Sequence, residues 1–263
     1  MLRAFSTAAT GMAAQQTAVD VTANNLANIN TTGFKRSQLD IQDLIYVKIR
    51  EAGQEVESGV LSPTGFEIGN GVQAVSTLKV FTQGEMENTG RNLDLAIEGD
   101  GFFQVTLPTG ETQYTRDGSL RIDSAGNLVT SSGNTLTDSI SIPADWRTIS
   151  VGKDGTVSVL AGSGSTPTTV GTINLARFSN PSGLSSMGGN LMAETPASGT
   201  ATTGSPGQSG LGSIQQGFLE RSNVQMVKEL VSLITAQRAY EINSRAIKAG
   251  DEMLTTANRL IGG

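Results

Sequence analysis

Cysteine and histidine are both missing from this 263-residue sequence, and tryptophan occurs once. Without cysteine the chain has no disulfides, thiolate metal ligands or cysteine nucleophile, and without histidine it has no imidazole for acid–base catalysis or metal binding. Charged residues make up only 16% of the chain and aromatic residues 5%. Catalysis would therefore depend on carboxylates, hydroxyls, lysine or tyrosine, and we expect no cofactor, no metal and no small-molecule substrate.

Three further features are absent, and each argues against a class of protein. No apolar run of about 18 residues occurs, so no transmembrane helix is expected. The net charge is −6, from 24 acidic and 18 basic residues, and no basic stripe could follow a phosphate backbone, so no nucleic-acid binding is expected. Residues 1–7 lack the apolar core of a secretory signal peptide, so we expect any export to leave the N-terminus intact.

The N-terminal region predicts a long helix. Residues 2–30 contain no proline, and their only glycine is Gly11. The apolar residues of this region include a column at intervals of seven: Phe5, Met12, Val19 and Leu26. This spacing is typical of a heptad seam, along which one helix packs against another.

The C-terminal region predicts a second helix of the same kind. A bulky column recurs there every seven residues: Met226, Leu233, Tyr240, Ile247, Leu254 and Ile261. A column of small or polar residues runs beside it: Ala236, Asn243, Gly250 and Ala257. Because isolated short helices are marginal in water, we expect residues 1–36 and 222–263 to pair as one coiled-coil stalk.

The outer surface of the N-terminal helix is unusual because residues 2–32 carry only two charges, Arg3 and Asp20. A surface helix of a monomer normally has a charged face, so we expect this one to be covered by neighbouring subunits or to line a confined aqueous space. Four asparagines near the helices allow two interpretations: Asn24, Asn25, Asn28 and Asn243. They either fix the register of the helices by side-chain hydrogen bonds or serve helix ends and turns.

The middle of the chain predicts β-structure, so the fold class is α+β with an irregular antiparallel β-domain at 81–221. Short alternating apolar runs flank Asp117-Gly118 and Asp154-Gly155, and Asp-Gly between such runs indicates a hairpin. Residues 180–217 are rich in glycine, serine and threonine and predict a loop. Residues 37–80 predict an extended connector with one or two strands.

The sequence offers little catalytic chemistry. Asp94, Glu98 and Asp100 are the best candidates for a glycosidase acting on peptidoglycan, because paired carboxylates can cleave glycosidic bonds without histidine. Asp94 and Glu98 are also an even number of residues apart in an alternating strand, where outward, solvated charges explain them equally well. We therefore expect a protein that is not an enzyme.

Two segments resemble the terminal motifs of one family. Residues 23–36 (ANNLANINTTGFKR) resemble the N-terminal motif of bacterial flagellar rod and hook proteins, and residues 222–244 resemble their C-terminal motif. Residues 63–72 (PTGFEIGNGV) are similar to a segment that distal rod members carry and hook protein lacks. The resemblance covers roughly residues 1–160 and 215–263. A proximal rod or hook member of the family is the alternative.

The resemblance implies a structural subunit that self-assembles into the hollow distal rod, a helical tube that crosses the periplasm and transmits torque from motor to hook. It also implies export through the flagellar type III export apparatus and contacts with proximal rod proteins, hook protein and the surrounding basal-body ring proteins. We expect residues 51–72 to form an arm that docks on a neighbouring subunit. The expected assembly interface comprises Phe5, Met12, Val19, Asn24, Asn25, Leu26, Asn28, Phe66, Ile68, Leu233, Tyr240, Asn243, Ile247 and Leu254.

Overall fold

The computed structural model describes residues 2–53, 55–57, 60–138, 140–162 and 166–261, and the chain separates into two compact units. The helical unit comprises Met1–Leu26, Ser37–Leu78 and Gln225–Gly263, and the β unit comprises Ala27–Arg36 and Lys79–Val224. These boundaries differ from those expected from the sequence. Most of the connector belongs with the helices, whereas residues 27–36 and 222–224 belong with the β-domain.

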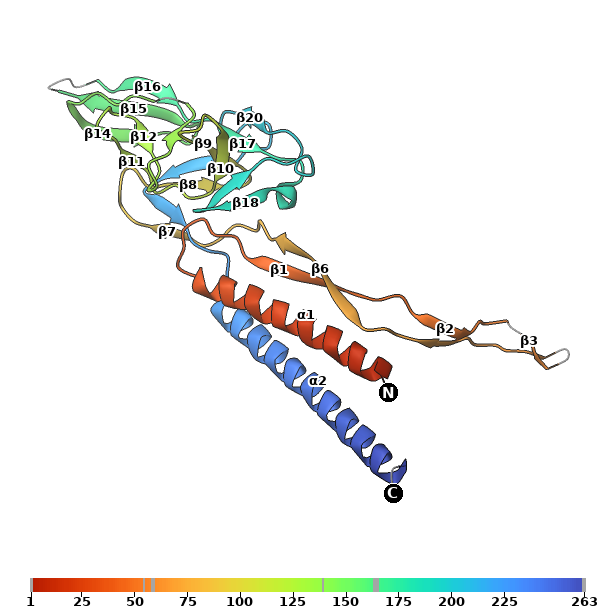
Figure 1. Cartoon of the computed structure of the whole chain (residues 1–263). Coiled ribbons are helices and arrows are strands. Elements are labelled where there is room, and N and C mark those ends of the chain that lie inside the picture. The colour runs from red at the N-terminus through yellow and green to blue at the C-terminus, as the bar shows by residue number, and fades with distance from the viewer. Residues whose placement is uncertain (1, 54, 58–59, 139, 163–165, 262–263) are drawn as a thin grey trace. The chain divides into compact units, whose positions relative to one another are not determined.

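The helical unit contains the two predicted helices, α1 (Leu2–Ala27) and α2 (Met226–Ile261), which pack antiparallel (Figure 1). The Phe5 ring lies against Gly250, where a Cβ would approach it to 2.8 Å, and the Asn243 amide lies against Gly11 in the same way. α2 begins with an acidic residue, Glu229, in its first turn and ends with a basic one, Arg259, as the helix dipole favours. The predicted α+β class and the pairing of the terminal helices are thus confirmed, and neither helix is long and apolar enough, over its described residues, to cross a membrane.

The predicted connector, residues 37–80, forms a ribbon of three strand pairs rather than an extended segment with one or two strands. β1 (Ser37–Asp43) pairs with β6 (Val72–Lys79), β2 (Val47–Arg50) with β5 (Phe66–Ile68), and β3 (Glu55–Glu57) with β4 (Val60–Leu61). The expectation of one or two strands was wrong. Most of the ribbon's side chains are exposed, so its sequence lacks the alternation that marks a half-buried strand.

The β unit contains one nine-stranded sheet and several smaller ones. The strands of the large sheet are β9 (Phe102–Thr106), β10 (Thr112–Thr115), β11 (Arg121–Ile122), β12 (Leu128–Val129), β13 (Thr135–Leu136), β17 (Leu175–Arg177), β18 (Ser185–Gly188), β19 (Leu191–Ala193) and β20 (Thr202–Gly204). β14 (Trp146–Val151), β15 (Thr156–Ala161) and β16 (Thr168–Thr172) form a three-stranded sheet, and β7 (Met86–Asn88) pairs with β22 (Phe218–Glu220) and β8 (Leu95–Glu98) with β21 (Ser213–Gln216).

These sheets enclose a closely packed apolar core. Phe103, Leu175 and Ile214 are completely buried within it. A second cluster is aromatic: the rings of Phe102 and Tyr114 each meet Phe178 edge-on, with centroids 5.8 and 4.7 Å apart. The β unit therefore has the burial needed to fold by itself.

The two predicted hairpins turned out differently. Asp154-Gly155 joins β14 to β15 in an antiparallel hairpin, with Gly155 at a φ of +82°. At Asp117-Gly118 the hairpin prediction was wrong, because β10 pairs with β9 and β19 while β11 pairs with β12. Gly118 instead packs against the carbonyl of Leu95, where no side chain would fit.

The predicted loop at 180–217 was also wrong, because this region contains β18, β19, β20, β21 and a short 3₁₀ helix, Pro181–Gly183. Its strands pair with distant parts of the β unit, β19 with β10 and β21 with β8. Leu184, Met192, Leu211 and Ile214 are buried and anchor the segment. A few well-spaced apolar residues and long-range pairing thus order a sequence that is locally typical of loops.

Candidate assembly surfaces

Most members of the predicted heptad columns are only half-buried in a single chain, and Met226, at the start of α2, is 52% exposed. The half-buried members are Phe5, Met12, Val19, Leu26, Leu233, Ile247 and Leu254. Tyr240 is 41% exposed and lines an open groove with Gln16 and Val19. The fully buried positions of the two helices are mostly small, as at Ala8, Ala14 and Ala236.

Asn25 makes side-chain hydrogen bonds to two other segments of the helical unit. Its side chain is buried, its Nδ2 donates to the Ser37 carbonyl at 2.8 Å, and its Oδ1 accepts from the Ser37 amide at 2.8 Å. Nδ2 also lies 3.2 Å from Oε2 of Glu229, a buried residue in the first turn of α2. One side chain therefore joins α1, the start of the ribbon and α2.

The other three asparagines are placed differently. Asn28 accepts a hydrogen bond from the Thr31 hydroxyl at 3.1 Å, which is turn chemistry just after α1. Asn243 packs against Gly11 across the helix pair. Asn24 is exposed on α1. The register interpretation therefore suits Asn25, and the turn interpretation suits Asn28.

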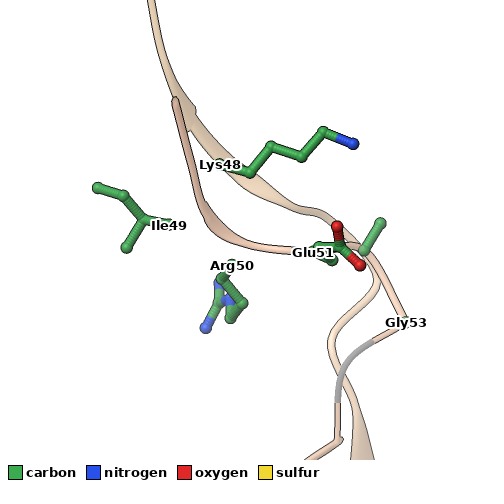
Figure 2. Close-up of a pocket in the computed structure, with 6 residues that line it drawn as sticks. Lys48, Ile49, Arg50, Glu51 and Gly53 are labelled. Carbon is green, nitrogen blue, oxygen red and sulfur yellow. The ribbon is translucent and has the colours of Figure 1, made fainter. Parts of the chain in front are cut away.

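The two expected anchors of the arm lie in the ribbon. Phe66 is 53% exposed and Ile68 is half-buried, both in β5. Opposite them, Lys48, Ile49, Arg50 and Glu51 line a shallow hollow in which Lys48 and Ile49 project to opposite sides (Figure 2). The ribbon thus presents large apolar side chains to solvent on a narrow support.

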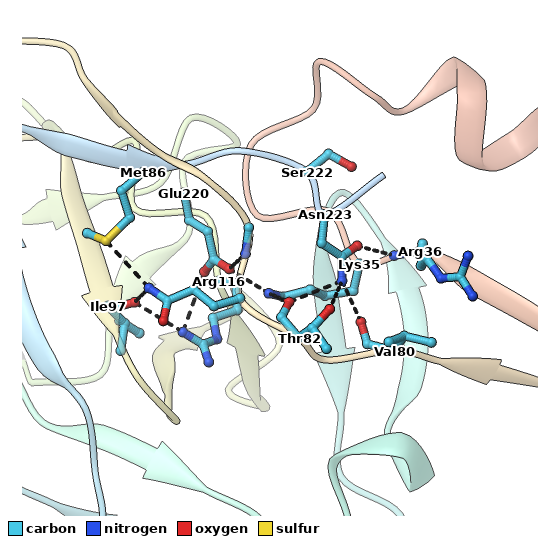
Figure 3. Close-up of polar contacts among 12 residues, drawn as sticks. Lys35, Arg36, Val80, Thr82, Met86, Ile97, Arg116, Glu220, Ser222 and Asn223 are labelled. Atoms are coloured by element: carbon cyan, nitrogen blue, oxygen red, sulfur yellow. Dashed lines mark hydrogen bonds and ion pairs between the residues drawn. The ribbon is translucent and has the colours of Figure 1, made fainter. Parts of the chain in front are cut away.

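A buried ion cluster in the β unit escaped the sequence interpretation. Lys35 Nζ lies 2.5 Å from Glu220 Oε1 and donates to the Thr82 carbonyl at 2.8 Å (Figure 3). Arg116 Nη1 lies 3.5 Å from the other oxygen of Glu220, and the Gly84 amide donates to Glu220 at 2.8 Å. The side chains of Lys35 and Glu220 are completely buried. Burial lowers the pKa of Lys35, while attraction to Glu220 opposes that shift.

The ion cluster ties the segment that follows α1 to the segment that precedes α2. The Gly33 amide donates to the Glu220 carbonyl at 2.8 Å, and the Arg36 amide donates to Oδ1 of Asn223 at 2.8 Å. Nδ2 of Asn223 in turn donates to the Val80 carbonyl at 2.8 Å. The sequence signal that could have revealed this cluster is Glu220, a carboxylate that directly follows the apolar pair Phe218-Leu219. No residue near Glu220 in the sequence indicates that its partner is Lys35.

Of the carboxylates considered for catalysis, Asp94 is buried, whereas Glu98 and Asp100 are exposed. Asp94 is buried, and its Oδ2 accepts from the Thr89 hydroxyl at 2.6 Å. The expectation of an outward, solvated Asp94 was wrong, because this residue sits at a bridge to Ser119 just before β8. Glu98 is exposed and accepts from Gln215 at 2.5 Å. Among the described residues no acidic cluster is arranged to hold a metal ion.

Comparison with known proteins gives matches along the whole chain. Three family models match: the flagella basal body rod protein at residues 5–35, the flagellar hook protein FlgE/F/G D1 domain at 96–159, and the flagellar basal body rod FlgEFG protein C-terminal region at 215–260. The flagellar basal-body rod protein FlgG of Borreliella burgdorferi is 47% identical over 262 residues, which cover 99% of both chains. FlgG of Caulobacter vibrioides is 45% identical over 98% of this chain and 99% of its own length, and FlgG of Bacillus subtilis is 38% identical over 97% of both.

Proposed function

This chain belongs to the flagellar basal-body rod protein family, a family of structural subunits, and on that premise we propose that it self-assembles into the distal rod. The proposed rod is a hollow helical tube that transmits torque from the motor to the hook. It meets proximal rod proteins at one end and hook protein at the other, and the basal-body ring proteins surround it.

The observation that carries this proposal is the placement of apolar side chains in the helical unit. Val227, Val231 and Ile242 of α2 are 76, 58 and 65% exposed. Exposed apolar side chains that recur along one helix mark a surface that other protein covers. In a polymer of identical subunits, neighbouring copies supply that cover.

The scarcity of charge on α1 supports a tube with a lumen. Arg3 and Asp20 are the only charged residues of α1. Later subunits that travel unfolded through the lumen would meet few ionic contacts on such a helix. We therefore propose export through the flagellar type III apparatus and a final location across the periplasm.

The ribbon supports the distal assignment over a hook or proximal rod paralogue. Its β2–β5 region carries Tyr46, Ile49 and Phe66, all about half-exposed, on a support too thin to bury them. We propose that this region docks on an adjacent subunit and resists sliding between subunits, which keeps the rod straight.

The direct test is polymerisation of the purified full-length protein. We expect straight, hollow rods in electron micrographs, formed above a critical concentration. Curved tubes would favour a hook-type member, and absence of any polymer under all conditions would contradict the proposal. Localisation in basal bodies by cryo-electron microscopy would separate a distal from a proximal position.

A further inference from the structure

The β unit carries an exposed aromatic side chain between two opposite charges. Trp146 is the first residue of β14, pairs with Ala161 of β15 and is 38% exposed. Asp145 precedes it and Arg147 follows it, and both are exposed. Neither charged side chain makes a hydrogen bond or an ion pair with any residue that the structure describes. We name residues 145–147 the Trp146 segment.

A hollow of about 200 Å³ elsewhere on the β unit carries the complementary groups. Its wall is aromatic, because the Phe102 ring meets the rings of Phe81 and Phe178 edge-on, with centroids 5.5 and 5.8 Å apart. Arg177 and Asp100 line the same hollow, and both are exposed. We name these five residues the Arg177 site. It offers an apolar wall together with one cation and one carboxylate.

Arg177 is held in place while its charge stays free. Its strand, β17, is paired on one side with β9 and on the other with β20. The guanidinium lies over Gly210, where a Cβ would come within 2.7 Å of Nη1 and where the φ of +77° also favours glycine. Within the described part of the chain, the Arg177 side chain has no hydrogen bond or ion pair. It is therefore available to a carboxylate, which a guanidinium can bind through two parallel hydrogen bonds.

The third charge that lines the hollow is not available in this way. Arg116 is buried, and its Nη1 lies 3.5 Å from Oε2 of Glu220 (Figure 3). The two charges of the hollow that a partner can reach are therefore Arg177 and Asp100, which match Asp145 and Arg147 in number and are opposite to them in sign.

The Trp146 segment and the Arg177 site belong to different ends of the β unit. The sheet of β14, β15 and β16 lies at one end, whereas β17 and β20 lie at the other (Figure 1). A chain therefore cannot fill its own site, but it can offer its segment to one neighbour and its site to another. Such a heterologous contact does not close on itself and generates an open assembly, as a rod requires.

We propose that the Trp146 segment of one copy binds the Arg177 site of a second copy. Trp146 enters the aromatic hollow, Asp145 pairs with Arg177, and Arg147 pairs with Asp100. A cavity of about 150 Å³ holds a benzene molecule, so the hollow has room for the exposed part of the indole. This contact between β units rests on the proposed self-assembly and names one pair of surfaces through which it occurs.

The fluorescence of Trp146 tests the contact directly, because the chain has no other tryptophan. In dilute monomer, acrylamide should quench this fluorescence readily. In rods, the emission should shift to shorter wavelength and most of the quenching should be lost. Rods in which Trp146 stays as accessible as in the monomer would overturn this contact while self-assembly stands, and failure to polymerise would overturn both.

Charge exchange tests the pairing of Asp145 with Arg177. Asp145→Arg and Arg177→Asp should each raise the critical concentration by about tenfold at low salt, because each places like charges together. The double exchange should restore it. The control is Arg121→Asp, at an exposed arginine of β11 outside the site, which should change it little. A double variant no better than either single variant would overturn the pairing.

Cross-linking identifies the occupant of the site, since the chain has no cysteine of its own. Ala144 adjoins the Trp146 segment, and Ser179 lines the hollow beside Arg177; both are exposed. With a short bis-maleimide, A144C/S179C rods should form a ladder of covalent dimers, trimers and longer chains, whereas dilute monomer should form none. The control A144C/M187C, at the exposed Met187 of β18, should form few cross-links. Normal rods without the ladder, or equal ladders from both variants, would show that a second copy does not fill the site in this way.

Discussion

The helical unit and the β unit differ in where their apolar side chains lie. In the β unit, large side chains such as Phe103, Leu175 and Ile214 are completely buried. In the helical unit, the buried hydrophobic residues among those described are only alanines: Ala8, Ala14 and Ala236. Conversely, all the exposed large hydrophobic residues found in the described part of the chain, except Trp146 and Met187, belong to the helical unit.

This difference indicates two sources of stability. Burial of apolar area is the main favourable term in folding, and the β unit obtains it from its own chain. The helical unit has apolar area of similar kind but leaves it uncovered, and in the proposed rod other copies would cover it. On that proposal, one chain combines a self-sufficient domain with a domain that assembly completes.

The largest expected effect is in the free monomer. In dilute protein, amides of residues 2–26 and 225–261 should exchange within seconds, because helices that lack tertiary cover are marginal. Core amides of the β unit should be protected by the global unfolding free energy of about 5–15 kcal/mol. Hydrogen exchange with mass spectrometry measures both, and limited proteolysis should remove the two terminal helices and leave a fragment that contains the β unit. Equal protection of amides in the two units would contradict the proposed difference in stability between them.

Sequence reasoning succeeded where a local pattern controls the structure. The heptad columns through Phe5 and Tyr240 predicted the two helices and their pairing, since that period reports which side of a helix is covered. They could not show that Tyr240 stays 41% exposed in one chain, because a column does not distinguish cover by the same chain from cover by another.

Sequence reasoning failed where the partner is distant. Lys35 and Glu220 are 185 residues apart, and neither has a neighbour that indicates the other. Several strands at 180–217 and in the ribbon, such as β19 with β10 and β1 with β6, also pair with strands far along the chain rather than showing local alternation. Asp94 was misplaced for a related reason: its burial depends on contacts with Thr89 and Ser119 that the strand pattern does not encode.

The next largest effect concerns the ion cluster of the β unit. Glu220→Ala leaves Lys35 and Arg116 as buried cations without a carboxylate, and removal of one member of a buried ion pair costs about 3–5 kcal/mol of unfolding free energy. The single tryptophan, Trp146 in β14, allows the β unit to be followed alone by fluorescence during denaturation.

The matched control is Glu87→Ala, which removes the exposed partner of Arg221 at 3.6 Å. Exposed ion pairs contribute little, so this variant should lose less than about 1 kcal/mol. If both variants unfold at the same denaturant concentration, the buried cluster does not stabilise the β unit.

A smaller effect is expected for Tyr240→Asp, and it should appear only on assembly. The side chain lines the groove between α1 and α2, so a carboxylate there would have to be desolvated when another copy covers the groove. We expect the critical concentration to rise by about tenfold or more, equivalent to at least about 1.4 kcal/mol per subunit. Tyr240→Phe is the control and should assemble. The unfolding of the β unit, followed by fluorescence, should not change in Tyr240→Asp. If cells that carry Tyr240→Asp are motile, the heptad column through Tyr240 does not have the predicted role in assembly.

The smallest effect on stability is expected in the ribbon, because its anchors make few contacts within one chain. Phe66 is 53% exposed, so Phe66→Ala together with Ile68→Ala should change monomer unfolding by less than about 0.5 kcal/mol. In the rod the same two side chains would be buried against a neighbour, and their loss should make isolated basal-body rods more flexible in electron micrographs.

Deletion of residues 51–68 removes β3, β4 and β5 while keeping the β1–β6 pair and both helices, so rods should still form but should be curved. The control is Lys48→Ala/Glu67→Ala, which removes paired polar side chains from the same strands without removing an apolar anchor. Straight rods of normal stiffness from the deletion variant would show that the ribbon is not the element that keeps the rod straight.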